Sequence, residues 1–402
     1  MTEAELRERL REEPVPGEQE ADRRAWEVVR SSYAARERVS WIERHSRLVL
    51  VVAAAAVLGV AAVTPPGQAV VERVRESVAG RTPSEPALLR LPSGGRLLVN
   101  SSQGSWVVRQ DGSKRRLGSY EGASWSPHGL FVVATRGRRV AALEPDGDVR
   151  WTVTRPNRVA QARWAPGGFR VAYREGSTLR IVIGNGEGDH LLASSVSPVA
   201  PAWRPGAVKN VLAYVDRARS VHVVDVDTRQ ELWSAGTGPA ARKLLWSDDG
   251  RRLIAVTDRA IRIYGPRGRR ISGGPTVPQG HLLVGAAVLP KGWFVYADFN
   301  ERTEETTLVR GTCIASDPCL AIGPTRMFSG AGRVENLVVS ADERWLLVGW
   351  PAADQLLFLR LPGTRGARRV FAVSNVAREF DPGGTGVRAF PHAAGWVEDA
   401  TS

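Results

Sequence analysis

Residues 122–135 read GASWSPHGLFVVAT, and closely similar stretches recur three times further along the chain. They begin at Gln161 (QARWAPGGFRVAYR), Ala200 (APAWRPGAVKNVLAYV) and Lys243 (KLLWSDDGRRLIAVT). The Trp residues of the four stretches, at positions 125, 164, 203 and 246, are 39, 39 and 43 residues apart. Self-similarity at a fixed period of this length is the signature of a repeat architecture.

Each repeat contains signals for four short strands. An apolar strand ends at the Trp, a Pro- or Gly-containing turn follows, and a second apolar strand comes next. A third strand (for example 181–183) and a last strand after a polar turn (for example 149–151) complete the unit. Four strands per ~40 residues are typical of a propeller blade, so the sequence predicts an all-β fold, a β-propeller. We expect four aromatic side chains to act as structural blade anchors between neighbouring blades: Trp125, Trp164, Trp203 and Trp246.

Weaker copies of the turn extend the array in both directions. The turns lie near residues 92, 126, 165, 204, 247, 290 and 340, and a partial copy lies near 381. We therefore predict about seven four-stranded blades over residues 88–398, with six or eight as alternatives and 399–402 as a tail. The first unit lacks an inner strand of its own, so a C-terminal strand, 372–380, is expected to complete the first blade.

The Trp/Ser-Pro-x-Gly unit resembles the TolB-like and WD40-like propeller repeat over about residues 88–398. The TolB-like type is the better match. The whole arrangement also resembles the single-pass, membrane-anchored propeller proteins of GC-rich actinobacteria. This resemblance implies a membrane-anchored bacterial binding protein.

An apolar segment precedes the repeats. Residues 48–63 read LVLVVAAAAVLGVAAV, with no charged or polar side chain, and Pro65 and Pro66 follow. At 1.5 Å per residue the run spans roughly 24 Å, somewhat less than the ~30 Å hydrocarbon core of a bilayer. A buried helix and a cleaved signal peptide are alternatives, but 47 residues before the run do not suit a signal peptide. We predict a transmembrane signal-anchor helix at 48–64.

The flanking segments indicate an orientation. Four Arg residues precede the apolar run closely, at positions 36, 38, 44 and 47. This bias places the N-terminus in the cytoplasm and the propeller outside the bacterial cell membrane. Residues 1–47 are predicted to form a cytoplasmic helical segment, either a solvated helix or a docking site for a cytoplasmic regulator. Residues 65–87 are predicted to form a linker with a short helix.

Two cysteines, Cys313 and Cys319, are the only ones in the chain. They could close a small loop through a disulfide, which would persist in an oxidising compartment outside the membrane. The alternative is two unrelated thiols, and their spacing does not match a CxxC metal motif.

No linear catalytic motif is found in the sequence. It contains no HExxH, GxSxG or GxxxxGK[ST] pattern, and the Gly-rich stretch 185–189 suits a hairpin turn better than a calcium loop. We predict no catalytic, cofactor-binding or metal-binding residues. The net charge of +13 comes from scattered Arg rather than one basic stretch, so no nucleic-acid partner is expected.

These observations favour a non-enzymatic module that binds a protein or an envelope ligand on the face of the propeller. A transmembrane signalling regulator (anti-sigma-like) with an outer propeller sensor is the alternative. A hydrolase or lyase with its site in the central channel is less favoured, because no linear catalytic motif is present. It stays an alternative, because a propeller can assemble such a site without any linear motif.

Overall fold

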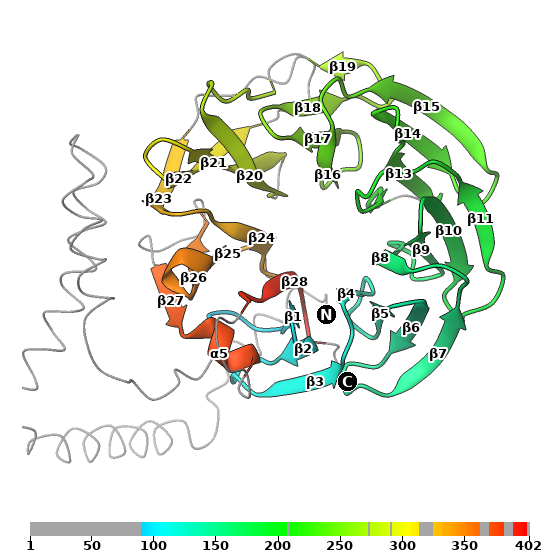
Figure 1. The fold of residues 1–402 in the computed structure, drawn as a ribbon, viewed down its shortest axis with the longest axis horizontal. Helices are drawn as coiled ribbons and strands as arrows, with labels where there is room; N and C mark the ends of the chain where they lie inside the picture. Colours follow the sequence, from blue (N-terminus) through cyan, green and yellow to red (C-terminus); the bar gives the residue numbers. More distant parts are fainter. Residues whose placement is uncertain are drawn as a thin grey trace, which may run out of the picture. The chain divides into compact units, whose positions relative to one another are not determined.

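The computed structural model describes residues 90–399, apart from 207–208, 272–273, 290–291, 313–324, 362–369 and 382–388. Seven four-stranded antiparallel sheets are arranged around a common axis (Figure 1). Together they form a seven-bladed β-propeller, so the predicted fold class and blade number are confirmed.

The blades are numbered along the chain, and their strands run from the axis outward. Blade 1 contains β28 (His392–Val397), β1 (Arg96–Ser101), β2 (Gly104–Val108) and β3 (Lys114–Gly118). Blade 2 contains β4 (Gly122–Trp125), β5 (Val132–Arg136), β6 (Arg139–Leu143) and β7 (Val149–Thr154). Blade 3 contains β8 (Val159–Trp164), β9 (Arg170–Glu175), β10 (Thr178–Ile183) and β11 (His190–Ala193). Blade 4 contains β12 (Ala202–Trp203), β13 (Val211–Val215), β14 (Ser220–Asp225) and β15 (Gln230–Gly236).

The remaining blades follow the same order. Blade 5 contains β16 (Ala241–Trp246), β17 (Leu253–Thr257), β18 (Ile261–Tyr264) and β19 (Arg270–Ile271). Blade 6 contains β20 (His281–Val288), β21 (Trp293–Asn300), β22 (Glu305–Thr312) and β23 (Thr325–Ala331). Blade 7 contains β24 (Glu335–Val339), β25 (Trp345–Trp350), β26 (Gln355–Arg360) and β27 (Val370–Ser374). Two short helices occur within the described residues, η1 (Pro351–Ala353) and α5 (Val376–Phe380).

The ring is closed by a strand from the C-terminal part of the chain, but not by the predicted one. β28 pairs antiparallel with β1, with Arg96 opposite Val397 and Leu98 opposite Gly395. The expected closing strand at 372–380 is wrong. Its first residues belong to β27, the outermost strand of blade 7, and its last five form α5.

The physical reason for the error lies at Asn375. This residue has φ +60° in the left-handed region, so the extended chain of β27 ends there. The Asp354 carboxylate accepts a hydrogen bond of 2.7 Å from the backbone N–H of Ala377, which favours helix in the next turn. α5 then buries Val376 and Phe380.

The apolar core lies between blades rather than within one sheet. One cluster joins Val133 and Val140 of blade 2 to Val171 and Tyr173 of blade 3. Because each strand alternates its side chains, every blade presents apolar groups to both of its neighbours. The interfaces repeat around the ring, and a single blade could not bury its two apolar faces alone.

Aromatic side chains on the outermost strands also fasten one blade to the next. Trp151 on β7 donates a hydrogen bond of 2.7 Å from Nε1 to the carbonyl of Gly184 in blade 3. A Cβ added at Gly186 would lie 2.8 Å from the Trp151 ring, and one at Gly268 of blade 5 would lie 2.7 Å from Trp233 of blade 4. Glycine is therefore required where these turns cover the rings.

Several predicted segments lie outside the described residues. They are the cytoplasmic segment 1–47, the transmembrane helix 48–64, the linker 65–87, most of the tail 399–402, and Cys313 and Cys319. Within the part of the chain that the structure describes, no helix has the length and apolar character needed to cross a membrane.

Candidate functional site

The seven innermost strands surround the propeller axis (Figure 1). Each of the four blade anchors is the last residue of its innermost strand. Trp203 and Trp246 are each 9% exposed, and each donates a hydrogen bond of 3.0 Å from Nε1 to a backbone carbonyl of the preceding blade. The acceptors are Arg163 and Ala202, which immediately precede the Trp of their own repeat. Each indole therefore ties two adjacent innermost strands together.

The two other predicted anchors occupy equivalent positions, and of these Trp164 alone lacks this indole contact. Trp125 is half-buried and donates to the carbonyl of Gly395 on β28 at 3.3 Å. Trp164 is buried and stacks on Phe131 of blade 2 at 6.3 Å between ring centroids. Its Nε1 has no hydrogen-bond partner among the described residues, and the Ser124 hydroxyl links the same two blades by donating to the carbonyl of Ala162 at 2.8 Å.

Sequence reasoning missed a fifth residue of this kind, Trp396 on β28. It is buried and meets Phe358 of blade 7 edge-to-face at 5.7 Å. The signal was present, because the short run 395–397 (Gly-Trp-Val) repeats the placement of a Trp at the end of an innermost strand. The strong turn sequence near residue 381 drew the prediction to the wrong segment.

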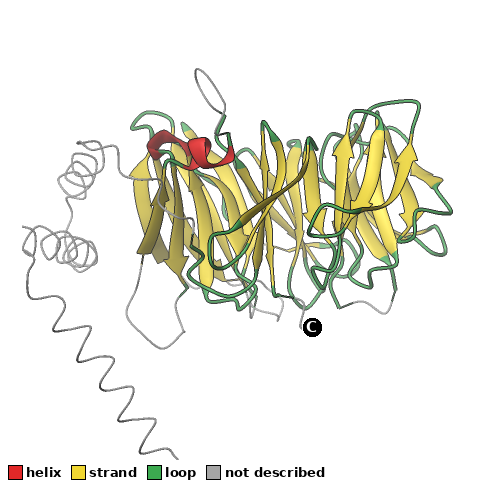
Figure 2. Cartoon of the chain, turned by 90° about the horizontal axis from the view of Figure 1, so that it is seen from below, coloured by secondary structure: helices red, strands yellow, loops and turns green. Residues whose placement is uncertain are grey.

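Loops gather on two opposite faces of the ring (Figure 2). We call one of them the turn face, because it carries the turns between the first and second strands of the blades, including 126–131, 165–169 and 247–252. α5 lies on the opposite face, because it leads from the outermost strand of blade 7 to the innermost strand of blade 1.

The turn face exposes two large apolar side chains on neighbouring blades. Phe169 is 71% exposed and Leu130 is 51% exposed, and each is the fifth residue after its blade Trp. The turns share one shape, with Gly129 at φ +66° and Gly168 at φ +75°. Blade 5 has an exposed Arg251 at the same place. Apolar groups of this size in water are typical of an interaction surface.

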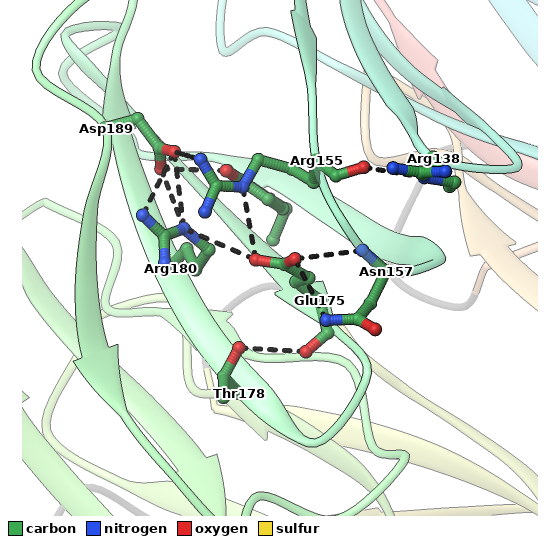
Figure 3. Close-up of polar contacts among 8 residues, drawn as sticks. Arg138, Arg155, Asn157, Glu175, Thr178, Arg180 and Asp189 are labelled. Atoms are coloured by element: carbon green, nitrogen blue, oxygen red, sulfur yellow. Dashed lines mark hydrogen bonds and ion pairs between the residues drawn. The ribbon is translucent and has the colours of Figure 1, made fainter.

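The most extensive polar cluster among the described residues joins blades 2 and 3 (Figure 3). Glu175 accepts hydrogen bonds from Arg155 Nε and from the backbone N–H of Asn157, both at 3.1 Å. Asp189 forms ion pairs with Arg155 at 2.8 Å and with Arg180 at 3.1 Å. Burial raises the pKa of Glu175, but the bonds from Asn157 and Arg155 outweigh it, and the net pKa is lowered.

This cluster is balanced, with two Arg facing two carboxylates, and it holds the loop after β7 against blade 3. Asp189 belongs to the Gly-rich stretch 185–189, and it also accepts a bond of 2.7 Å from the Tyr173 hydroxyl. Its oxygens are therefore committed to protein donors, which agrees with a hairpin turn rather than a calcium loop. Within the described residues no group of His, Cys, Asp or Glu is arranged to hold a metal ion.

A second polar group lies on blade 4 around His222. Its Nδ1 lies 2.7 Å from Glu231 and its Nε2 lies 3.0 Å from Asp216, while the ring stacks on Tyr214 at 5.0 Å. Only the imidazolium donates from both nitrogens. Burial opposes this charged form, but the two carboxylates outweigh burial and raise the pKa of His222.

Two cations lie on innermost strands without a carboxylate partner. Arg163 is on β8 and Lys243 is on β16, and neither forms an ion pair with any described residue. The side chain of Lys243 is exposed to solvent, and its Nζ donates to the carbonyl of Ala286 in blade 6 at 2.9 Å. Desolvation and, second, the positive charge of Arg163 lower its pKa to about 8. Desolvation also lowers the pKa of Arg163.

Comparison with known proteins supports the fold. No family model matches the chain, and no curated protein matches it. Among solved structures it is similar to a chain of a mitotic checkpoint complex, with a TM-score of 0.51 and 17% identity over 70% of this chain and 95% of that one. It is also similar to the β-propeller domain of Cps50 (Swd1) from Myceliophteria thermophila, with a TM-score of 0.50 and 11% identity over 64% and 86%.

A chain of hydrazine synthase from Kuenenia stuttgartiensis matches with a TM-score of 0.45 and 12% identity over 59% of this chain and 75% of that one. That likeness is too weak to carry an argument about activity. At these identities the comparisons show the fold alone, a β-propeller.

Proposed function

We propose that the chain is a membrane-anchored, extracytoplasmic propeller of TolB-like type that binds a protein or envelope ligand without catalysing a reaction. The observation that carries the binding role is the exposure of Phe169 and Leu130 on adjacent turns of one face. Aromatic and aliphatic groups that lose contact with water on binding provide much of the affinity of protein interfaces.

Two further features support this proposal. The most extensive polar cluster, between blades 2 and 3, is internally paired and holds blades together. The Cps50 domain and the mitotic checkpoint chain share the fold, and the latter is named as part of a multiprotein complex. The apolar run at 48–63 and the Arg residues before it support the membrane anchor and its orientation.

Site-specific photocrosslinking in cells that produce the full chain tests the binding role. A benzophenone amino acid at Leu130 is expected to give an adduct of defined mass, and the substitution Phe169→Ser is expected to reduce that adduct at least tenfold. The matched control position is Leu191, which is 49% exposed on the outermost strand β11 and pairs with Arg180 in the middle of β10, between the two faces. An adduct of equal yield at Leu191, or one insensitive to Phe169→Ser, would refute a specific site on the turn face.

The anchor and orientation have a separate test. The full chain is expected to stay in the membrane fraction after alkaline extraction, and protease added to intact spheroplasts is expected to cut the propeller but not residues 1–47. Extraction of the full chain into the soluble fraction contradicts the anchor. Protection of the propeller from the protease contradicts the orientation.

A second candidate function is transmembrane signalling, with the propeller as sensor and residues 1–47 as an anti-sigma-like regulator. It is favoured by the order of segments, a charged N-terminal stretch followed by the apolar run and then the propeller. Deletion of residues 1–47 is then expected to change the transcript profile while the propeller still reaches the membrane. An unchanged profile contradicts this role.

A further inference from the structure

The face opposite the turn face carries a concentrated group of arginine side chains. The second strand of each blade runs away from the turn face, so the hairpins between second and third strands lie on this opposite face. Residues 136–139 (Arg-Gly-Arg-Arg) form this hairpin in blade 2, and the connection from blade 2 to blade 3 lies on the same face. We call four exposed side chains of these two segments the arginine patch: Arg136, Arg138, Arg139 and Arg158.

Hydrogen bonds hold the two segments of the arginine patch against one another. The backbone N–H of Arg155 donates to the carbonyl of Arg138, and Arg138 Nε donates to the carbonyl of Arg155, both at 2.8 Å (Figure 3). The N–H of Val159 donates to the carbonyl of Gly137 at 2.8 Å. Because these bonds lie on both sides of Arg158 in the chain, Arg158 is held beside the hairpin.

The arginine patch holds more positive charge than nearby carboxylates neutralise. Glu121 accepts a hydrogen bond from Arg158 at 2.6 Å, and the two carboxylates of the neighbouring polar cluster pair with Arg residues of that cluster. Arg136 and Arg139 form no hydrogen bond or ion pair with a described residue, and Arg138 uses one of the five donors of its guanidinium. Arg136 and Arg139 are directly opposite one another in the β5–β6 pair, where like charges are destabilising. Stability of the fold therefore does not explain this arrangement.

Further arginines on the same face extend the positive charge to blades 4 and 5. Arg217 and Arg219 lie in the hairpin of blade 4, Arg259 lies in that of blade 5, and all three are exposed. Their side chains form no hydrogen bond or ion pair with a described residue. The N–H of Arg217 donates to the carbonyl of Ser195 at 2.8 Å, which joins the hairpin of blade 4 to the connection from blade 3. The hairpin of blade 6, 300–305, instead contains three Glu and one Arg, so the positive charge ends there.

The chemistry of this face favours a polyanion over a protein partner. Protein interfaces bury apolar groups at their centre, but the large apolar side chains exposed among the described residues lie in turns of the turn face or on outermost strands. Guanidinium groups match the oxygens of phosphate with paired donors, and several of them neutralise successive charges of a linear polyanion. Because successive blades surround an axis, the path of these charges is curved, and a flexible chain follows such a path more easily than a stiff duplex does.

An anionic lipid surface is less favoured as the partner of this face. The first described residues join the propeller on the turn face, where the N–H of Leu91 donates to the carbonyl of Gln110 at 3.1 Å. The arginine patch is therefore on the other side of the propeller from the point where the chain enters it.

We propose that the arginine patch, together with Arg217, Arg219 and Arg259, binds a flexible, linear polyanion that carries phosphate groups. Binding is electrostatic, with guanidinium groups donating to successive phosphates, and it is therefore weakened by salt. The site lies on the opposite face from Leu130 and Phe169, so it does not depend on the partner of the turn face.

Arginine-directed labelling of the full chain in detergent maps this site. Phenylglyoxal modifies exposed guanidinium groups, and mass spectrometry of the peptides reports the rate at each position. Inorganic polyphosphate is expected to slow the labelling of Arg136 and Arg139 at least fivefold at low salt, and high salt is expected to restore the rate. Arg251, which is exposed on the turn face, is the internal control and is expected to keep its rate.

Titration of two charge-matched variants with polyphosphate provides the second measurement. The patch variant removes three charges from the arginine patch: Arg136→Gln, Arg139→Gln and Arg158→Gln. The matched control removes three charges from exposed positions on the turn face of blade 5: Arg251→Gln, Arg267→Gln and Arg269→Gln. The patch variant is expected to bind at least tenfold more weakly than the wild type at low salt, while the control binds as the wild type does. At about 0.7 per contact, the loss of three contacts reduces the slope of log affinity against log salt concentration by about 2.

The competing classes of anion are tested in the same labelling assay with duplex DNA and with mixed micelles that contain phosphatidylglycerol. Stronger protection of Arg136 and Arg139 by either of these than by polyphosphate overturns the proposal. It is also overturned if polyphosphate protects neither residue, if it protects Arg251 equally, or if the matched control loses as much affinity as the patch variant. Because the labelling uses the unaltered chain, a patch variant that fails to fold leaves the proposal testable.

Discussion

Replacing Trp203 with Ala tests the role of the blade anchors directly. A Trp side chain buries about 150–250 Å², and Trp203 keeps only 9% of its surface exposed. At about 25 cal/mol per Å² the buried area stabilises the fold by about 4–6 kcal/mol. The unfolded chain already hides part of this surface, which lowers the expected loss to about 3–5 kcal/mol.

The hydrogen bond of Trp203 can be separated from its bulk. Trp203→Phe keeps an aromatic ring against blade 3 but leaves the carbonyl of Arg163 without the indole donor. The lost hydrogen bond is expected to lower the free energy of unfolding of this variant by about 1 kcal/mol, in addition to the effect of the smaller ring. Trp125→Ala is expected to cost less than Trp203→Ala, because Trp125 is only half-buried and its hydrogen bond is longer.

Urea denaturation followed by far-UV circular dichroism gives the free energies, since Trp fluorescence itself changes in these variants. Each protein is compared at one pH and salt concentration. If Trp203→Ala unfolds within 1 kcal/mol of the wild type, or if Trp125→Ala costs more than Trp203→Ala, the reasoning from burial is refuted.

Two further predictions concern the outer parts of the blades. Gly268→Ala is expected to destabilise the propeller by at least 1 kcal/mol more than Gly168→Ala in the same denaturation assay. The two glycines share φ +75°, but a Cβ at 268 would lie 2.7 Å from the Trp233 ring, whereas one at 168 would meet nothing within 4 Å; equal losses would contradict the steric argument. The second prediction is a pH dependence due to His222, whose pKa is raised by its two carboxylates against the effect of burial. The folded state then binds the proton more tightly than the unfolded state, so this stabilisation is complete below pH ~6.5 and is lost as the pH rises through the raised pKa. The stability difference between the wild type and His222→Gln, measured across that range, should shrink as the pH increases, and a constant difference would count against the imidazolium.

The blade repeat could be predicted from the sequence because its signals are local. A strand that ends in Trp and a turn with Gly at positive φ together span only about fifteen residues, so the pattern can be recognised locally. The repeats around Trp164 and Trp246 are examples. The period of about 40 residues then indicates four strands per repeat and therefore a propeller. This inference does not depend on which blades pack against one another.

Ring closure could not be predicted in the same way. The segments 372–380 and 392–397 are both short and partly apolar, and pairing with β1 depends on contacts across the whole domain. The local sequence also favoured the wrong segment, because Asp381 and the Pro-Gly-Gly after it resemble a blade turn. Asn adopts the left-handed region more readily than most residues, but this preference alone does not show that β27 ends at Asn375.

The exposed turn residues could have been predicted from the sequence, whereas Arg163 and Lys243 could not. Phe169 and Leu130 could have been found from the repeat, because they share one position in it and are large and apolar. Arg163 and Lys243 are 80 residues apart and occupy different positions relative to their Trp residues. Only the closed ring brings them to one axis.

The pairing of β28 with β1 has a consequence for how the protein acquires its fold. Residues paired across this joint are separated by about 300 positions in the chain. Most other strand pairs are formed between near neighbours in the chain. During synthesis the molecule therefore grows as an open arc of finished blades, with Leu97 and Val99 of β1 lacking a cover. It becomes a ring only when residues 392–397 have emerged, so closure of the ring must follow the synthesis of blades 2 to 7.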